Sequence, residues 1–470
     1  MSSSAHFNAD IFKRRRAEFM KRMVGGVAVI PAQSMRLRNG DVYFEYRQDS
    51  DFFYLTGFEE PGSLAILTPG HAEHKFVLFV PPRDKTMEIW NGRRAGPEGA
   101  KSVYGADAAF AIEEIEKVLP DYVKNNKVLY VHLGDDDEFE KRVMGWLNKV
   151  RAMKRQGHNA PTELHDPSEI LHEMRLIKND DDLGFMRAAG KLGSAGHRAA
   201  MAATRPGMFE YQVQAEFEYA CKKGGSQRLG YPSIVASGDN ANILHYHENN
   251  MVCKDGDLIL MDAGCEVAMY TSDITRCWPV NGKFSAAQKE VYEWVLKAQL
   301  ASIDKCRPGV PFMDVHWKSV EVLTEGMVAM GLLKGDPKKI IADQKQWDED
   351  VKNKKKDPKN DKAPKSYREF YMHNTSHWLG MDVHDVGVYR YGEKWRELAP
   401  GCVLTVEPGI YIAAERDDVP AKYKGIGVRI EDDVLVTKGD PEVLTKDAPK
   451  TVSEIEAVMA AGARELVGSR

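Results

Sequence analysis

The sequence predicts two α/β domains, and three observations point to them. The chain has 470 residues, more than the length at which a single hydrophobic core usually stops growing. Hydrophobic residues make up 43% of it, enough to fill two cores. Short β-rich runs alternate with helical stretches in the first half, whereas longer helical patterns are interleaved with strand-like runs in the second. We therefore expect two α/β domains with a boundary near residue 175.

The first half is predicted to open with a helix. Ile11, Phe12, Phe19 and Met23 recur at helical spacing and would line one face of it. The three arginines at 14–16 are interpreted as its solvated face rather than as a targeting signal. The opening residues contain no apolar stretch and no small-residue cleavage site, so we expect no export signal.

The rest of the first half is predicted to form a mixed sheet with helices. Strand-like runs occur in "GGVAVIPAQ", "LAILTP", "HKFVLFVPP" and "NKVLYVHLG", and the aromatic "DSDFFYLTGF" also has the composition of a core strand. Helical patterns cover 109–119 and 138–150. The polar, proline-punctuated stretch at 155–168 is interpreted as the connection to the second domain.

The second half is predicted to place helices over one face of a curved antiparallel sheet. Helical patterns cover 179–203, 208–224, 285–306 and 312–332. Strand-like runs cover 257–270, 272–280, 402–413 and 427–437. The lysine-rich stretch 336–366 has almost no aliphatic residues after its start and cannot bury enough apolar surface to fold alone. We interpret it as an exposed charged insertion.

The charge balance and the cysteines exclude several classes of protein. Lys and Arg total 65 against 70 Asp and Glu, a net charge of −5, so nucleic acids are not expected as partners. The six cysteines include no Cys-x-x-Cys pair and fit reduced core thiols in a reducing, cytoplasmic location. No window approaches eighteen apolar residues, so no membrane span is expected.

Aspartates occur where the surrounding residues look buried. In "LILMDAGCEVAMYTSDITRCWPV", two strand-like runs carry Asp262 and Asp273. Aspartate is depleted in strands and costly to bury unpaired. A hairpin would bring the two carboxylates together, and they repel unless a proton or a cation lies between them. The pair is therefore either part of a metal site or two exposed aspartates at a sheet edge.

The same feature recurs downstream. Glu407 ends an apolar run in "VLTVEPGIYI", and Glu431 lies in the strand-like "GIGVRIEDDVLVT". Four carboxylates at strand positions, with His377 in "TSHWLGMDVHD", favour a cluster held by metal. Mostly oxygen ligands with one imidazole favour manganese before zinc, with cobalt or iron as further options. Four carboxylates are more than one ion needs, so two ions that share carboxylates would account for all of them. Sites of this kind catalyse hydrolysis.

These motifs carry a resemblance to a known family. The ordered segments "DAG…TSDITR", "SHWLGMDVHD", "TVEPGIY" and "GVRIEDD" resemble the pita-bread metallopeptidases, and most of all aminopeptidase P, the Xaa-Pro aminopeptidases. In the first half, "FEYRQDSDFFYLTGFEEP" and "EIWNGRRAGPEGA" are similar to the amino-terminal domain of aminopeptidase P. The resemblance implies an aminopeptidase P-like domain at 1–175 and a catalytic pita-bread domain at 176–470.

The resemblance also implies the metal ligands. Asp262 and Asp273 would ligate one divalent ion, while Asp273 and Glu431 bridge to a second ion, which also takes His377 and Glu407. The two ions, manganese by preference, would activate a water as the nucleophile. Glu407 would accept its proton and relay it to the leaving nitrogen.

Five further residues match family positions around the substrate. His245 and His384 would face the substrate and steady the scissile carbonyl and the tetrahedral intermediate. His373 would lie near the proline pocket and Tyr411 near the metals, while Arg429 would pair with a ligating carboxylate. By their positions alone, these histidines are more typical of satisfied core residues.

The implied activity is removal of the N-terminal residue from peptides with proline at the second position. The nearest alternative is prolidase, the Xaa-Pro dipeptidase, which shares every metal ligand. A second alternative is a non-catalytic peptide-binding protein of the same fold. A homo-oligomer, dimer or tetramer, is expected from the resemblance.

Overall fold

The computed structural model describes residues 8–468. Residues 1–7 and 469–470 lie outside the described residues. The prediction that the chain opens without an export signal concerns residues 1–7 in part, and the structure does not test it there. The chain divides into two compact units, residues 1–174 and 175–470. Both have the mixed α/β structure that the sequence predicts.

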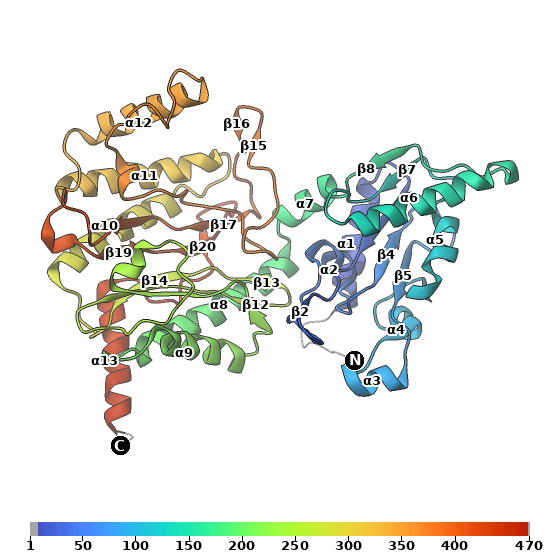
Figure 1. Ribbon diagram of the computed structural model, residues 1–470, viewed down its shortest axis with the longest axis horizontal. Coiled ribbons are helices and arrows are strands. Elements are labelled where there is room, and N and C mark those ends of the chain that lie inside the picture. Colours follow the sequence, from blue (N-terminus) through green and yellow to red (C-terminus); the bar gives the residue numbers. More distant parts are fainter. Residues whose placement is uncertain (1–7, 469–470) are drawn as a thin grey trace. The chain divides into compact units, whose positions relative to one another are not determined.

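The first unit is built on a six-stranded mixed sheet of order β6-β5-β4-β1-β7-β8 (Figure 1). Its strands are β1 (Val27–Pro31), β4 (Leu64–Leu67), β5 (Phe76–Val80), β6 (Ala108–Ala111), β7 (Val128–Tyr130) and β8 (Glu163–His165). A separate two-stranded hairpin consists of β2 (Leu37–Asn39) and β3 (Val42–Tyr43).

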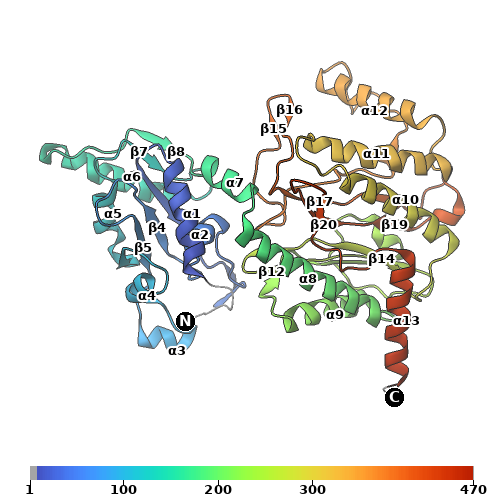
Figure 2. The ribbon, with the colours of Figure 1, turned by 180° about the vertical axis from the view of Figure 1, so that it is seen from behind.

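Helices cover both faces of this sheet, as Figures 1 and 2 show from opposite sides. The helices of this unit are α1 (Ala9–Arg22), α2 (Ser50–Thr56), α3 (Lys85–Asn91), α4 (Gly96–Ser102), α5 (Ile115–Val123), α6 (Asp137–Ala152) and α7 (Ser168–Leu176), and not all of them cover the sheet, since α3 buries none of its residues. Alternate strand residues such as Val27 and Val29 form one core with Leu119 and Trp146 of α5 and α6. The opposite face of the sheet is covered by α1 and α2.

The opening helix α1 is present, but its arginines do not all face solvent. Arg14 is exposed, whereas Arg15 and Arg16 are buried and donate to the carbonyls of Tyr54 and Leu55. These carbonyls lie in the last turn of α2, where backbone oxygens lack intrahelical donors. The prediction of a solvated arginine face is therefore wrong for two of the three side chains, which cap a neighbouring helix instead.

Two predicted elements of the first half have the wrong type. "DSDFFYLTGF" forms helix α2 rather than a core strand, because Asp49 caps its start and Gly57, at φ 65°, ends it. The helix predicted at 109–119 begins only at residue 115; Ala108–Ala111 instead form β6, paired in parallel with β5. A short apolar run carries no decisive period, and pairing with a neighbouring strand decides its structure.

All four helices predicted in the second half are present, as α8 (Asp180–Ala203), α9 (Glu210–Lys223), α10 (Ala286–Ile303) and α11 (Phe312–Ala329). Helices α12 (Pro337–Lys352) and α13 (Val452–Gly468) complete the set that the described residues contain. The pairs α8–α9 and α10–α11 lie on opposite sides of the central strands (Figures 1 and 2). One large core joins both pairs to the strands.

Three of the four predicted strands of the second half, 257–270, 402–413 and 427–437, are interrupted, whereas 272–280 contains the single strand β14 (Thr275–Pro279). Short antiparallel pairs result. The principal strands are β10 (Ile234–Ser237), β11 (Leu258–Asp262), β14 (Thr275–Pro279), β17 (Val403–Val406), β18 (Gly409–Ile412), β19 (Ile426–Arg429) and β20 (Asp432–Leu435). Shorter strands are β9 (Arg228–Leu229), β12 (Cys265–Val267), β13 (Tyr270–Thr271), β15 (Arg390–Tyr391), β16 (Lys394–Trp395) and β21 (Glu442–Val443). The pairs include β10–β11–β14, β17–β20 and β18–β19.

The charged segment 336–366 is partly helical. Its first part forms α12, which begins at an Asp336 cap and buries Ile340 and Gln344 against α11. The remainder is turn-rich and largely exposed. The segment thus gains structure by packing on a neighbouring helix rather than by folding alone.

All six cysteines lie within the described residues, buried and free of disulfides. None of the helices described between residues 8 and 468 combines the length and the apolar character needed to cross a membrane.

Candidate active site

Asp262 and Asp273 meet because their strands pair. Asp262 ends β11 and lies opposite Thr275, which begins β14. Asp273 lies two residues before Thr275, in the break between β13 and β14. The Tyr231 hydroxyl lies 2.7 Å from Asp262 Oδ1 and 2.5 Å from Asp273 Oδ1. The two carboxylates therefore share one hydroxyl and lie within a few ångströms of one another.

His377 and Glu407 are brought together by an extended segment beside β17. The amides of Leu379, Thr405 and Glu407 donate to the carbonyls of Val403, His377 and Thr375, so residues 375–379 run antiparallel to β17, with an isolated bridge between Trp378 and Leu404. Pro408 follows Glu407 and has no amide hydrogen, so the strand ends there. His377 Nε2 lies 3.7 Å from Glu407 Oε1 and 3.4 Å from Asp273 Oδ2.

Glu431 enters the cluster from the break between β19 and β20, which lie beside β14 and β17 (Figure 1). Its Oε2 accepts a 2.6 Å hydrogen bond from Thr275 Oγ1. Asp273, His377 and Glu431 each offer a ligand atom, and these atoms all lie within 4.8 Å of one another. The five side chains for which the sequence predicts metal binding therefore converge on one place.

Burial and mutual repulsion disfavour simultaneous ionisation of these carboxylates. Burial raises the pKa of Glu407 to about 8, against the opposing pull of His377 and Arg429. It raises the pKa of Glu431 well above its usual value, with Asp273 and Glu407 adding repulsion. Burial also raises the pKa of Asp262, whereas for Asp273 it is outweighed by the His377 and Tyr231 hydrogen bonds, which lower its pKa.

The cluster consequently fits a divalent cation. A cation among these oxygens removes the repulsion and restores the ionised form of each carboxylate. The orientation of His377 agrees, since its Nδ1 lies 3.0 Å from the Trp378 carbonyl and leaves Nε2 facing the carboxylates. Four carboxylates with one imidazole form an oxygen-rich set, which suits hard or borderline divalent ions.

Arg429 connects the cluster to the other predicted site residues. Its Nη2 donates to Asp262 Oδ2 at 2.8 Å, and its Nη1 donates to the Tyr411 hydroxyl at 3.0 Å. Tyr411 in turn lies 2.7 Å from His373 Nε2. Burial, with repulsion from Arg429, lowers the pKa of His373 to about 3, so its imidazole is neutral and can accept the Tyr411 proton. The arginine, tyrosine and histidine form one hydrogen-bonded chain.

The two remaining predicted residues, His245 and His384, are exposed side chains at the same site. The His384 ring packs edge-on against His377, with centroids 4.5 Å apart. Partial burial, with repulsion from His377 and His245, lowers the pKa of His384. His245 also contributes repulsion at His373, so both exposed histidines border the cluster.

Sequence reasoning missed three residues that hold the ligands. Tyr231 binds both aspartates, Thr275 binds Glu431, and Asp433 accepts the backbone N–H of Asp273 with both carboxylate oxygens at 3.2 Å. Thr275 and Asp433 lie two residues from predicted ligands, a spacing that could have identified them. Tyr231, in "RLGYPS", is about thirty residues from the first ligand and gives no such signal.

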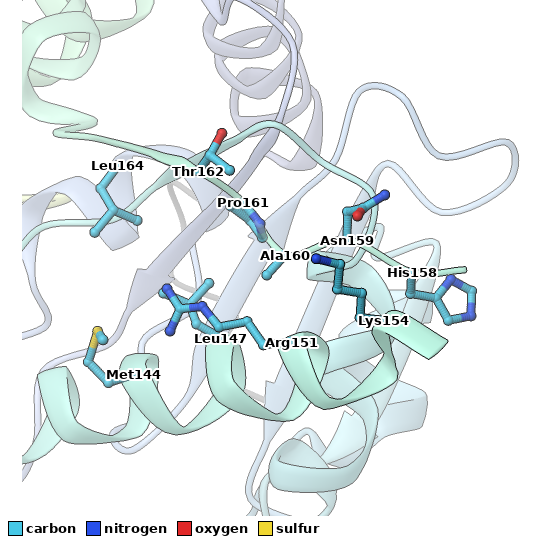
Figure 3. A pocket seen from close by; sticks show the side chains of 10 residues that line it. All are labelled: Met144, Leu147, Arg151, Lys154, His158, Asn159, Ala160, Pro161, Thr162 and Leu164. Carbon is cyan, nitrogen blue, oxygen red and sulfur yellow. The ribbon is translucent and has the colours of Figure 1, made fainter. Parts of the chain in front are cut away.

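A separate cavity of about 620 Å³ lies in the first unit, between α6 and residues 158–164 (Figure 3). Its lining includes Leu147, Arg151 and Lys154, and none of the candidate site residues contributes to it.

Comparison with known families gives two matches that together span most of the chain. Residues 184–438 match the model of metallopeptidase family M24, and residues 12–131 match the aminopeptidase P N-terminal domain. The first match contains the whole carboxylate and histidine cluster.

Individual relatives and solved structures agree with these matches. The Xaa-Pro aminopeptidase of Escherichia coli K12 is 41% identical over 456 residues, 97% of this chain and 98% of the relative. Aminopeptidase PepP of Pseudomonas aeruginosa matches at TM-score 0.90 and 47% identity, over 97% of this chain and 99% of that one. Zinc-substituted E. coli aminopeptidase P in complex with product matches at TM-score 0.88 and 40% identity, over 97% and 99%. The predicted two-domain architecture, with a pita-bread second domain, is confirmed.

Proposed function

The chain belongs to metallopeptidase family M24, and from this premise we propose that it hydrolyses the N-terminal Xaa-Pro bond of peptides. The observation that carries the proposal is the convergence of four carboxylates and His377 in a buried site. Full-length similarity to proteins named Xaa-Pro aminopeptidase supports proline at the second position of the substrate.

We assign the metal ligands as Asp262, Asp273, His377, Glu407 and Glu431, holding two divalent ions, with manganese preferred. Five ligands with four carboxylates exceed what one ion needs, which supports two. When bound, such ions lower the pKa of water and polarise the scissile carbonyl.

The remaining roles belong to the protein's own side chains. Glu407 would accept a proton from the attacking water and return it to the leaving nitrogen, because its carboxylate lies in the cluster, 3.7 Å from His377 Nε2. His245 and His384 would donate hydrogen bonds to the oxygen that gains charge during the reaction. Arg429 would hold Asp262 and Tyr411 in place, and His373 with Tyr411 would border the proline ring.

The substrate class is tested with metal-stripped protein reloaded with manganese. We expect release of arginine from an Arg-Pro-Pro tripeptide and little cleavage of a Gly-Pro dipeptide, measured by chromatography of the products. The reverse preference would identify a prolidase. If neither peptide were hydrolysed, with or without manganese, the result would favour a non-catalytic peptide-binding protein.

Metal removal should make stability depend on pH in a defined direction. Glu407, with its pKa raised to about 8, keeps a proton in the folded state that the unfolded chain releases near pH 4.5, so stability is lost as pH rises through 8. His377, raised to about 9 by Asp273 and Glu407 despite burial, contributes stability below about pH 6.5 that is lost as pH rises through 9.

Added metal competes with these same protons. The increase in Tm produced by excess manganese should therefore grow between pH 6 and pH 9, measured by calorimetry on stripped and reloaded protein. An increase in Tm that stays constant over this range would contradict the assigned ligands.

Self-association, as a dimer or tetramer, is supported by an apolar surface of the first unit. Helix α3 buries none of its residues, and Ile89 and Trp90 are each 80% exposed. Ile89→Asp should shift the sedimentation coefficient towards the monomer value. Val24→Asp, at an equally exposed apolar residue outside α3, should not. A monomeric wild type would contradict the proposal.

A cytoplasmic location is supported by six buried cysteines that are free of disulfides. Cell fractionation tests it, and recovery from an oxidising compartment would contradict it.

A further inference from the structure

The two histidines of the segment 377–385 are held in different ways. His377 is fixed by its own contacts, since its Nδ1 lies 3.0 Å from the Trp378 carbonyl and its backbone N–H donates to Thr405 Oγ1 at 3.1 Å. His384 contacts the His377 ring, yet among the described residues, 8–468, no hydrogen bond reaches its imidazole. The position of His384 must therefore come from its backbone, and so from the residue that anchors that backbone.

The anchor is the next residue, Asp385. Its carboxylate is buried between two cations: Arg175 Nη2 donates to Oδ1 at 2.7 Å and Lys178 Nζ donates to Oδ2 at 2.9 Å. The three side chains are between 1% and 4% exposed, so the ion cluster is shielded from bulk solvent. Arg175 also donates to the half-exposed Asp382 at 2.6 Å.

The same segment is closed on itself around this ion cluster. The Asp385 N–H donates to the Trp378 carbonyl at 2.9 Å, and the Thr271 N–H donates to the Gly380 carbonyl at 2.9 Å. Gly380 is required, because a Cβ there would collide with the Asp385 carboxylate and crowd the Lys178 side chain. The carboxylate thus fills the interior of the turn and sets its shape.

We propose that Asp385, with Arg175 and Lys178, is a positioning group that holds His384 over the reacting carbonyl. This inference rests on the proposed peptidase function, because His384 has a role only if a charge develops on that oxygen. The geometric requirement is strict, since a misplacement of about 1 Å at a catalytic group can cost roughly 100-fold in rate.

A double-mutant cycle between Asp385→Asn and His384→Ala tests the proposal on the manganese-loaded enzyme. In the wild-type background, Asp385→Asn should lower kcat about 10- to 100-fold and change KM by less than about 3-fold, because His384 acts on the transition state. In the His384→Ala background, Asp385→Asn should lower kcat less than about 3-fold further. Equal losses in both backgrounds would overturn the proposal.

Lys178→Met provides a milder variant in case Asp385→Asn does not fold. It leaves the bond from Arg175 to Asp385 in place, so a smaller loss of kcat in the same direction is expected. Glu266→Gln is the matched control: it breaks another buried ion pair, with Arg228 at 2.6 Å, and should lower stability without lowering kcat. A comparable loss of kcat in this control would mean that the effect is merely structural.

Hydrogen exchange of the segment separates this inference from the proposed function. Amides of residues 378–389 should exchange faster in Asp385→Asn than in the wild type, and should be unchanged in Glu266→Gln. Unchanged exchange in Asp385→Asn would overturn the positioning role whether or not the protein is active. An inactive wild type with the expected exchange pattern would instead overturn the proposed peptidase function.

Discussion

Asp273→Asn is expected to lower kcat/KM at least about 10³-fold and to prevent full metal loading. Asp273 lies 3.4 Å from His377 and shares the Tyr231 hydroxyl with Asp262, so its carboxylate is the point at which the ligands meet. Asparagine keeps the shape but removes the charge that a bridging ligand needs. Loss of the polarising ions forfeits several kcal/mol of transition-state stabilisation, about 4 kcal/mol for each 10³-fold. Metal content and peptide hydrolysis would be measured on the same preparation.

Asp182→Asn is the matched control for this substitution. Asp182 is also buried and also accepts a hydrogen bond from a tyrosine, Tyr270, at 2.6 Å, but it lies in the first turn of α8, where it accepts the backbone N–H of the cap residue Asn179. The Asp182→Asn variant should keep its bound metal and its peptidase activity. If Asp273→Asn retained both ions and near-normal turnover, the ligand assignment would be wrong.

The sequence predicts the ligand set because burying an unpaired carboxylate is energetically unfavourable. A carboxylate inside an apolar run therefore indicates a functional site. Glu407 and Glu431 lie where apolar runs would otherwise continue, and in the structure each occupies a break between two short strands. The predicted strands were too long for this reason. An unbroken strand would alternate its side chains between two faces, whereas a break lets a carboxylate turn towards its partners. The breaks are as informative as the residues themselves.

Two residues that support the site could not be predicted in the same way: Tyr231, which binds two ligands, and Arg175, which binds Asp385. Both are common residue types at unremarkable positions, and only the fold brings them to their partners, Arg175 from more than 200 residues away in the chain. The buried Arg15 and Arg16 show the same limit, because a run of charges resembles a solvated face until a neighbouring helix end supplies acceptors. A sequence pattern therefore identifies charged residues whose burial is unfavourable. Only the tertiary structure shows which hydrogen-bond or ion-pair partners stabilise them.

Glu407→Gln should separate proton transfer from metal binding. The amide oxygen can still act as a ligand, so the ions should remain, but glutamine cannot accept a proton. General acid–base catalysis contributes about 10²- to 10⁴-fold, and a loss of kcat in this range is expected with KM little changed. The leaving nitrogen of an Xaa-Pro bond departs poorly until it is protonated, so the loss should be smaller for a depsipeptide analogue whose leaving atom is oxygen.

Metal analysis decides between the two roles of Glu407. Retained ions with a kcat loss of at least about 10²-fold would support proton transfer by this carboxyl, which lies 3.7 Å from both His377 and His373. If Glu407→Gln lost as much metal as Asp273→Asn, the result would support a role for Glu407 in metal binding alone. Retained ions with normal turnover would move proton transfer to another group, and His384, exposed beside His377, would be the next side chain to test.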